Sequence, residues 1–141
     1  MKKAIGTTVL GLIVVMMLTG CAGNKNENIA AGMTAVEALD YDGALISFEA
    51  ARQAGEDERL LYRGEGMAYM GKTMYAEAAQ AFETALSLSS GRINGMDYDI
   101  NYYLAAAYYK QGELGRAVDV YSAIIALRDS ERDAYYLRGA I

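Results

Sequence analysis

One pattern of small and aromatic residues recurs along the chain, and this repetition constrains the fold more than any other feature. Its clearest copy is residues 75–88, YAEAAQAFETALSL. A small residue holds one equivalent position in each unit, with separations of 34, 39 and 34 residues between Gly32, Gly66, Ala105 and Gly139. A second column, Ala44, Ala78 and Ala117, repeats the separations of 34 and 39 residues. The agreement of the two columns places one five-residue insertion within 89–96 and predicts an array of stacked helical hairpins.

Each unit is expected to consist of two amphipathic helices, because its apolar residues recur every three or four positions. The predicted units span 25–58, 59–92 and 98–131, with an incomplete unit at 132–141. In the first unit, apolar residues at helical spacing run from Ile29 to Leu39. The residues expected to pack the repeats together are Gly32, Ala44, Phe48, Gly66, Ala78, Phe82, Ala105, Ala117, Tyr121 and Gly139.

The second and third units carry the most specific pattern: Tyr62, Gly66, Tyr69, Ala78, Phe82 and Ala85, then Leu104, Ala105, Tyr108, Gly112, Ala117 and Tyr121. This pattern resembles the tetratricopeptide repeat, and the resemblance covers about 26–141. It implies an all-α, helix-turn-helix repeat solenoid of about three repeats plus a partial fourth, preceded by a signal-peptide helix. The chain departs from the family pattern where a proline usually follows the second helix, since Glu56, Ser90 and Asp129 stand there.

The N-terminus has the pattern of a secretory signal. Lys2 and Lys3 precede an apolar stretch, 4–18, which is followed by Leu18-Thr19-Gly20-Cys21. About 15 apolar residues span roughly 22 Å as a helix, short of the ~30 Å hydrocarbon core of a bilayer. A permanent transmembrane helix is therefore the weaker interpretation.

The four residues ending at Cys21 resemble the lipobox of bacterial lipoproteins. The resemblance implies that 1–20 is a removed signal peptide, that Cys21 carries lipid, and that 21–28 forms a flexible tether to a repeat domain at 29–141. The expected location is the extracytoplasmic face of the cell membrane, or the outer membrane in a host that has one. The alternative is an ordinary signal peptide with a cysteine near its end.

Composition argues against several functions. The net charge is −5, and without residues 1–20 it becomes −7, a balance unsuited to binding phosphates of nucleic acid. The chain has no histidine, and its one thiol, Cys21, is assigned to lipid. Asp97 and Asp99 are better interpreted as helix-entry caps than as a cation site. We therefore expect no catalytic residue, no metal and no cofactor.

The resemblance also implies that the first helices line a groove for a peptide or a partner helix. The residues that map there are Met33, Arg63, Met67, Met70, Tyr102, Ala106, Tyr109 and Lys110. The alternative is that they only pack the solenoid. The expected function is a non-enzymatic, membrane-anchored interaction scaffold for an envelope protein or peptide. Two alternatives stay open: the N-terminal part of a longer protein with another activity, favoured by the incomplete fourth unit, and a peptide- or solute-binding lipoprotein.

Overall fold

The computed structural model describes residues 25–127 and 132–141. Over these residues the chain is a succession of helices joined by short turns and one longer loop. The helices are α1 (Glu27–Glu37), α2 (Tyr41–Ala54), α3 (Glu58–Gly71), α4 (Tyr75–Ser87), α5 (Gly95–Gln111), α6 (Leu114–Leu127) and α7 (Arg132–Gly139).

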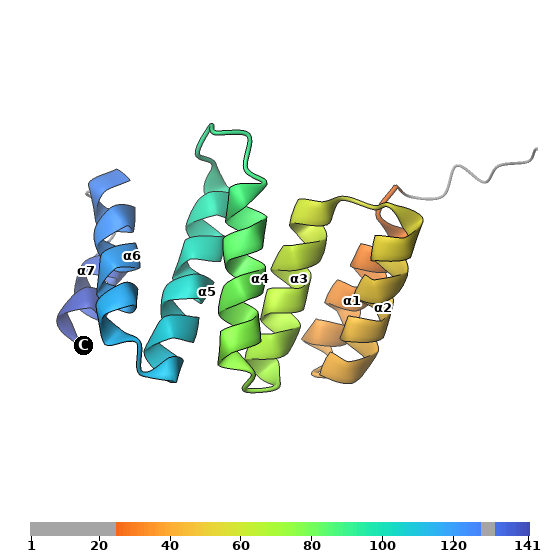
Figure 1. Cartoon of the computed structure of the whole chain (residues 1–141), viewed down its shortest axis with the longest axis horizontal. Coiled ribbons are helices and arrows are strands. Elements are labelled where there is room, and N and C mark those ends of the chain that lie inside the picture. Colours follow the sequence, from red (N-terminus) through yellow and green to blue (C-terminus); the bar gives the residue numbers. More distant parts are fainter. Residues whose placement is uncertain (1–24, 128–131) are drawn as a thin grey trace, which may run out of the picture.

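Each helix packs against the next one along the chain, and neighbouring first helices also touch, α1 against α3 and α3 against α5. Figure 1 shows the hairpins standing side by side in chain order, with α7 against α6. Each hairpin thus contacts only its neighbours, which is the arrangement of a solenoid. The predicted all-α repeat fold is confirmed.

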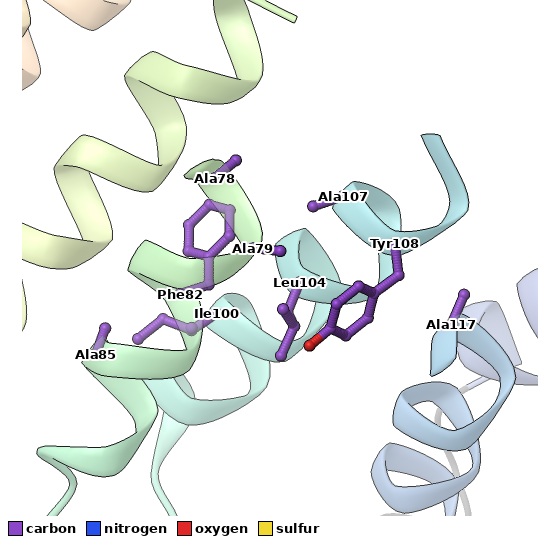
Figure 2. Close-up of a cluster of buried hydrophobic side chains, with 9 residues drawn as sticks. All are labelled: Ala78, Ala79, Phe82, Ala85, Ile100, Leu104, Ala107, Tyr108 and Ala117. Carbon is purple, nitrogen blue, oxygen red and sulfur yellow. The ribbon is translucent and has the colours of Figure 1, made fainter. Parts of the chain in front are cut away.

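The ring of a phenylalanine fills the space that each small residue leaves. An ideal Cβ atom on Gly32 would lie 2.5 Å from Cε1 of Phe48, and one on Gly66 would lie 2.5 Å from Cε1 of Phe82. Both rings are fully buried. Figure 2 shows Phe82 among alanines of α4, including Ala78, beside side chains of α5. The glycines therefore admit the rings into the hairpin core, where dense packing is favourable.

Gly139 does not have this packing. It is exposed, and apart from its chain neighbours and the backbone of its own helix no described atom lies within 4 Å of the Cβ that would be built on it. The ring that contacts Gly32 or Gly66 comes from the second helix of the same unit. No second helix follows α7 within the 141 residues, so the packing expected of Gly139 is missing from the described part of the chain.

The buried side chains form one cluster for each pair of neighbouring hairpins and one for the C-terminal end. The first surrounds Phe48, the second Phe82, and the third joins Ala105 and Tyr121 to α7. Met67 packs against the first two clusters and so links them. The expected packing residues Ala44, Ala78 and Ala117 are buried in them too.

The turn inside each hairpin uses a residue in the left-handed conformation. Leu39, Thr73 and Gly112 hold the equivalent position, with φ values of 62°, 59° and 83°. At the first turn α1 ends at Glu37, and Leu39 is exposed rather than on the apolar face of the helix. The prediction for Leu39 is wrong because the paired turn hydrogen bonds, Leu39 to Val36 and Asp40 to Ala35, end the helix before it.

Replacing Thr73 by glycine is expected to stabilise the protein. A left-handed backbone costs an L-residue roughly 1–2 kcal/mol, and glycine avoids this cost. Glycine also makes the unfolded chain more flexible, which offsets about 0.5–1 kcal/mol of the stabilisation. We therefore expect Thr73→Gly to raise the free energy of unfolding by up to about 1 kcal/mol, measured by urea denaturation. Gly112→Thr should lower it. A Thr73→Gly variant less stable than the original would contradict this account of the turn.

Candidate functional site

The residues that were mapped to a groove come from three helices that pack side by side. Arg63, Met67 and Met70 are spaced by four and three residues on α3, and Tyr102, Ala106 and Tyr109 have the same spacing on α5. Residues at this spacing share one face of a helix. We call these six residues, with Met33 of α1 and Lys110 of α5, the first-helix surface.

Arg63 is not a free cation on this surface. Its Nε donates to Oδ2 of Asp99 at 2.9 Å, and its Nη2 contacts the same oxygen. This ion pair joins α3 to α5 and neutralises the middle of the first-helix surface. Since the Asp99 side chain is more than a third exposed, the pair itself adds at most about 1 kcal/mol to stability.

The methionines of the first-helix surface are partly buried. Met33 packs against the Phe48 cluster and Met70 against the Phe82 cluster, while Met67 touches both. These contacts favour the packing interpretation for the three side chains. Their exposed parts add polarizable apolar area to the surface, which adapts readily to a bound side chain.

The two tyrosines of α5 differ in exposure. Tyr102 is partly buried, with its ring centroid 6.2 Å from that of Tyr121 on α6. Tyr109 is 48% exposed and next to the exposed Lys110. Tyr109 and Tyr121 line a small cavity of about 140 Å³ whose other walls are Leu137, Ala140 and Ile141. The first-helix surface therefore ends in an apolar recess.

Sequence reasoning did not assign Leu137, Ala140 or Ile141 to this recess. The sequence did contain a signal for these residues, because the C-terminal segment beyond the last complete unit is apolar at Tyr135-Tyr136-Leu137 and at Ile141. Such a segment was interpreted as an unfinished repeat. In the structure α7 packs on α6, and this packing brings its last residues to Tyr109.

Two buried carboxylates, Glu56 and Asp97, hold the starts of helices at one end of the array. Glu56, in the turn between α2 and α3, accepts hydrogen bonds from the backbone amides of Asn28 at 3.0 Å and Ile29 at 2.9 Å. Burial alone would raise the pKa of Glu56, but these amides and the Asn28 side chain outweigh it and lower the pKa. Glu56 occupies a position where the family usually has proline, and here it caps the start of α1.

The cap formed by Glu56 makes stability depend on pH. A carboxylate whose pKa is lowered in the folded state contributes stability above its unfolded pKa, about 4.3 for glutamate, and loses it as pH falls through the folded pKa. We expect Glu56→Gln to lower the melting temperature at neutral pH and to flatten its decline below pH ~4. Melting curves from pH 7 to 3 measure this. An unchanged slope in the variant would contradict the role of Glu56, and Glu49→Gln, on the exposed face of α2, serves as control.

Asp97 has the equivalent role between the second and third hairpins. It completes a capping box with Asn94 at the start of α5, which confirms the interpretation of Asp97 as a cap. The same interpretation is wrong for Asp99, which lies inside α5 and pairs with Arg63. Asp97 is also ion-paired with Arg59, whose Nε donates to the carbonyl of Ala85 at 3.1 Å. Burial would raise the pKa of Asp97, but the Asn94 amide, the Ser89 hydroxyl and Arg59 together lower it.

Two further charge clusters lie between helices. Arg52 donates to Glu65 at 2.6 Å and lies over the ring of Tyr62. Arg116 donates to Glu83 at 2.7 Å and lies 4.0 Å from the ring centroid of Tyr108. Burial is the larger cause and the hydrogen bond to Glu83 the second cause that raise the pKa of Tyr108 to about 12. This tyrosine therefore stays protonated at neutral pH. Both clusters join consecutive hairpins.

The predicted signal peptide, 1–20, and the predicted lipidation site, Cys21, lie outside the described residues. Within the part of the chain that the structure describes, the helices are too short or too polar to cross a bilayer. In the same part, the histidine, cysteine and acidic side chains form no group of three that could hold a metal ion.

A family model described as tetratricopeptide repeat matches residues 29–93 and 63–134. These two ranges together include most of α1, all of α2 to α6 and the start of α7. No curated protein matches the chain. The matched ranges cover most of the sequence, and their helices stack as repeats of this kind do. The chain therefore belongs to the tetratricopeptide repeat family, whose repeats are scaffolds for protein–protein interaction.

Proposed function

We propose that this protein is a lipid-anchored scaffold that binds an envelope protein or peptide on its first-helix surface. The observation that carries the proposal is Tyr109, which is 48% exposed beside an apolar recess of about 140 Å³. Tyrosine supplies a large, rigid contact area with a polar tip, which is why it is common where interfaces gain most of their affinity. The recess offers a pocket for one apolar side chain of the partner.

The electrostatics of the first-helix surface support an apolar or amphipathic partner. Arg63 is paired with Asp99, which leaves Lys110 as the exposed cation beside Tyr109. An amphipathic helix or an extended segment with an apolar anchor suits such a surface, because the anchor fills the recess while polar groups stay at the rim. Catalysis has no support in these residues, which offer tyrosine hydroxyls, thioethers and one ammonium group.

The anchor belongs to the same proposal. Cys21 follows a basic start, an apolar stretch and two small residues, and it precedes the first described residue, Lys25, by four positions. A lipidated cysteine with at least two acyl chains would hold the protein stably on a membrane. Cys21→Ser is expected to release the protein from membranes or to block its processing. A cleaved Cys21→Ser protein that stays in the membrane fraction would contradict the anchor.

Replacing Tyr109 by alanine tests the binding surface. Because tyrosines beside a well-packed interface pocket are among the residues that contribute most to affinity, we expect at least about tenfold weaker binding to partners isolated from native membranes. Tyr102→Ala should add to the loss, with a thermal melt to check folding because Tyr102 packs on Tyr121. The matched control is Ile46→Ala, an exposed apolar side chain on α2. Unchanged binding by Tyr109→Ala, or an equal loss in the control, would refute the surface.

A further inference from the structure

One end of the array gathers several segments that are far apart in sequence. Glu56 holds the start of α1, and Arg59 reaches both the end of α4 and the start of α5. Figure 1 shows that α6 ends at the same side and that the loop 88–94 projects there beyond the helices. We call this side the tether edge. It comprises the start of α1, the turn 55–57, the loop 88–94 and the end of α6.

Apolar side chains are exposed on the tether edge. Leu88 is 42% exposed, Ile93 48% and Leu127 52%. Ile93 and Leu127 form part of the wall of a recess of about 350 Å³, together with Leu86, Ala123 and Ile124. The five-residue insertion that breaks the repeat period was placed within 89–96, which covers most of this loop and the first two residues of α5. The longer loop therefore adds exposed apolar surface between the second and third hairpins, whereas the junction between the first and second hairpins is the short turn 55–57.

The charges of the loop differ from those of the whole chain. Residues 88–94 contain Arg92 and no acidic residue, although the chain is acidic overall. The nearest carboxylates, Asp97 and Asp99, are paired with Arg59 and Arg63. Among the described residues, the exposed acids at or beside this edge are Glu27, Asp57 and Glu58 at the starts of α1 and α3, and Asp133 in the first turn of α7. The loop is thus the part of the edge that combines apolar side chains with a cation.

We infer that the tether edge lies on the lipid bilayer, with Ile93 in the interface and Arg92 at the phosphate groups. The inference rests on the lipid anchor of the proposed function. Four residues from Cys21 to Lys25 reach at most about 14 Å, so the anchor holds this edge close to the membrane. At so short a distance, the tether gives a weak contact a high effective concentration. An arginine beside apolar side chains suits the interface, because its stem lies in the apolar region and its guanidinium reaches the headgroups.

A tryptophan probe tests the contact, because the chain contains no tryptophan of its own. The chain from Cys21 onward, which includes every described residue, is coupled through Cys21 to a maleimide lipid in vesicles of phosphatidylethanolamine and phosphatidylglycerol. Ile93→Trp is compared with Leu114→Trp, which is 42% exposed in the original and lies at the opposite ends of the helices. On the vesicles, the emission of the probe at 93 is expected to shift to shorter wavelength and to be quenched by brominated lipids, whereas the emission of the probe at 114 should not change.

Quenching of neither probe, or of both equally, would overturn the inference. In the first case the apolar side chains of the edge face water or a protein partner instead of lipid. Matching circular dichroism spectra of the two variants exclude unfolding as the cause of any difference. In this experiment the lipid is attached to Cys21 chemically, so the result does not depend on whether Cys21 is acylated in the cell. The release of Cys21→Ser from native membranes tests that separate question.

Discussion

Replacing Gly66 by alanine is expected to lower the free energy of unfolding by about 3 kcal/mol, near the upper limit for overpacking a core. The new methyl group would lie 2.5 Å from Cε1 of Phe82, much closer than carbon atoms approach each other. The ring has little room to move, since it is fully buried and stacks on Tyr103 with a centroid distance of 5.6 Å. Urea denaturation of the variant measures the loss.

Gly115→Ala is the matched control. Gly115 is the second residue of α6, and a Cβ atom built there would meet no described atom within 4 Å apart from its chain neighbours and the backbone of its own helix. Because alanine is the better helix former by about 1 kcal/mol, this variant should be as stable as the original or slightly more stable. Equal effects of the two substitutions would contradict the claim that Gly66 is small in order to admit the ring of Phe82.

Replacing Arg59 by alanine is expected to cost about 3 kcal/mol, the size of effect seen when one partner of a buried ion pair is removed. Both side chains of the pair with Asp97 are largely buried, with exposures of 16% and 8%. The variant would leave Asp97 without its cation and the carbonyl of Ala85 without its donor. The second and third hairpins would lose their most buried ion pair, and the loss is measured by urea denaturation.

Arg63→Ala controls for the loss of an arginine on the same helix. Arg63 pairs with Asp99 between the same two helices, but the Asp99 side chain is 40% exposed, so the loss should be no more than about 1 kcal/mol. In a double-mutant cycle, Arg59→Ala with Asp97→Asn should cost less than the sum of the single changes. Additive effects, or equal losses for Arg59 and Arg63, would contradict the buried pair.

Much of the fold could be predicted because each repeat shows, within its own short sequence, which residues pack its two helices together. Gly32, Gly66 and Ala105 stand in one column, and their separations of 34 and 39 residues match those of Ala44, Ala78 and Ala117, which indicated where the helices lie. Leu39 shows where periodicity is insufficient. Its apolar character suits the face of α1, yet the helix ends two residues earlier in a turn whose equivalent in the third hairpin is Gly112. Neither Leu39 nor Thr73 is a residue type that signals a left-handed turn.

The polar contacts of the site could not be predicted, because their partners are distant in sequence. Arg63 and Asp99 are 36 residues apart, and Glu56 caps residues 27 and 28 positions before it. Nothing in the local pattern pairs these side chains. The recess at Tyr109 was missed for a related reason, since Leu137 and Ile141 reach it only through the packing of α7 on α6.

Site-specific crosslinking in native membranes tests the central claim most directly. A photoreactive phenylalanine analogue is placed at Tyr109 on the first-helix surface or at Ile46 on α2, both of which are exposed. The account predicts that the probe at 109 forms one main crosslinked product with an envelope protein or peptide and that the probe at 46 does not. The same products from both positions, or a product from 46 alone, would contradict a partner on the first-helix surface.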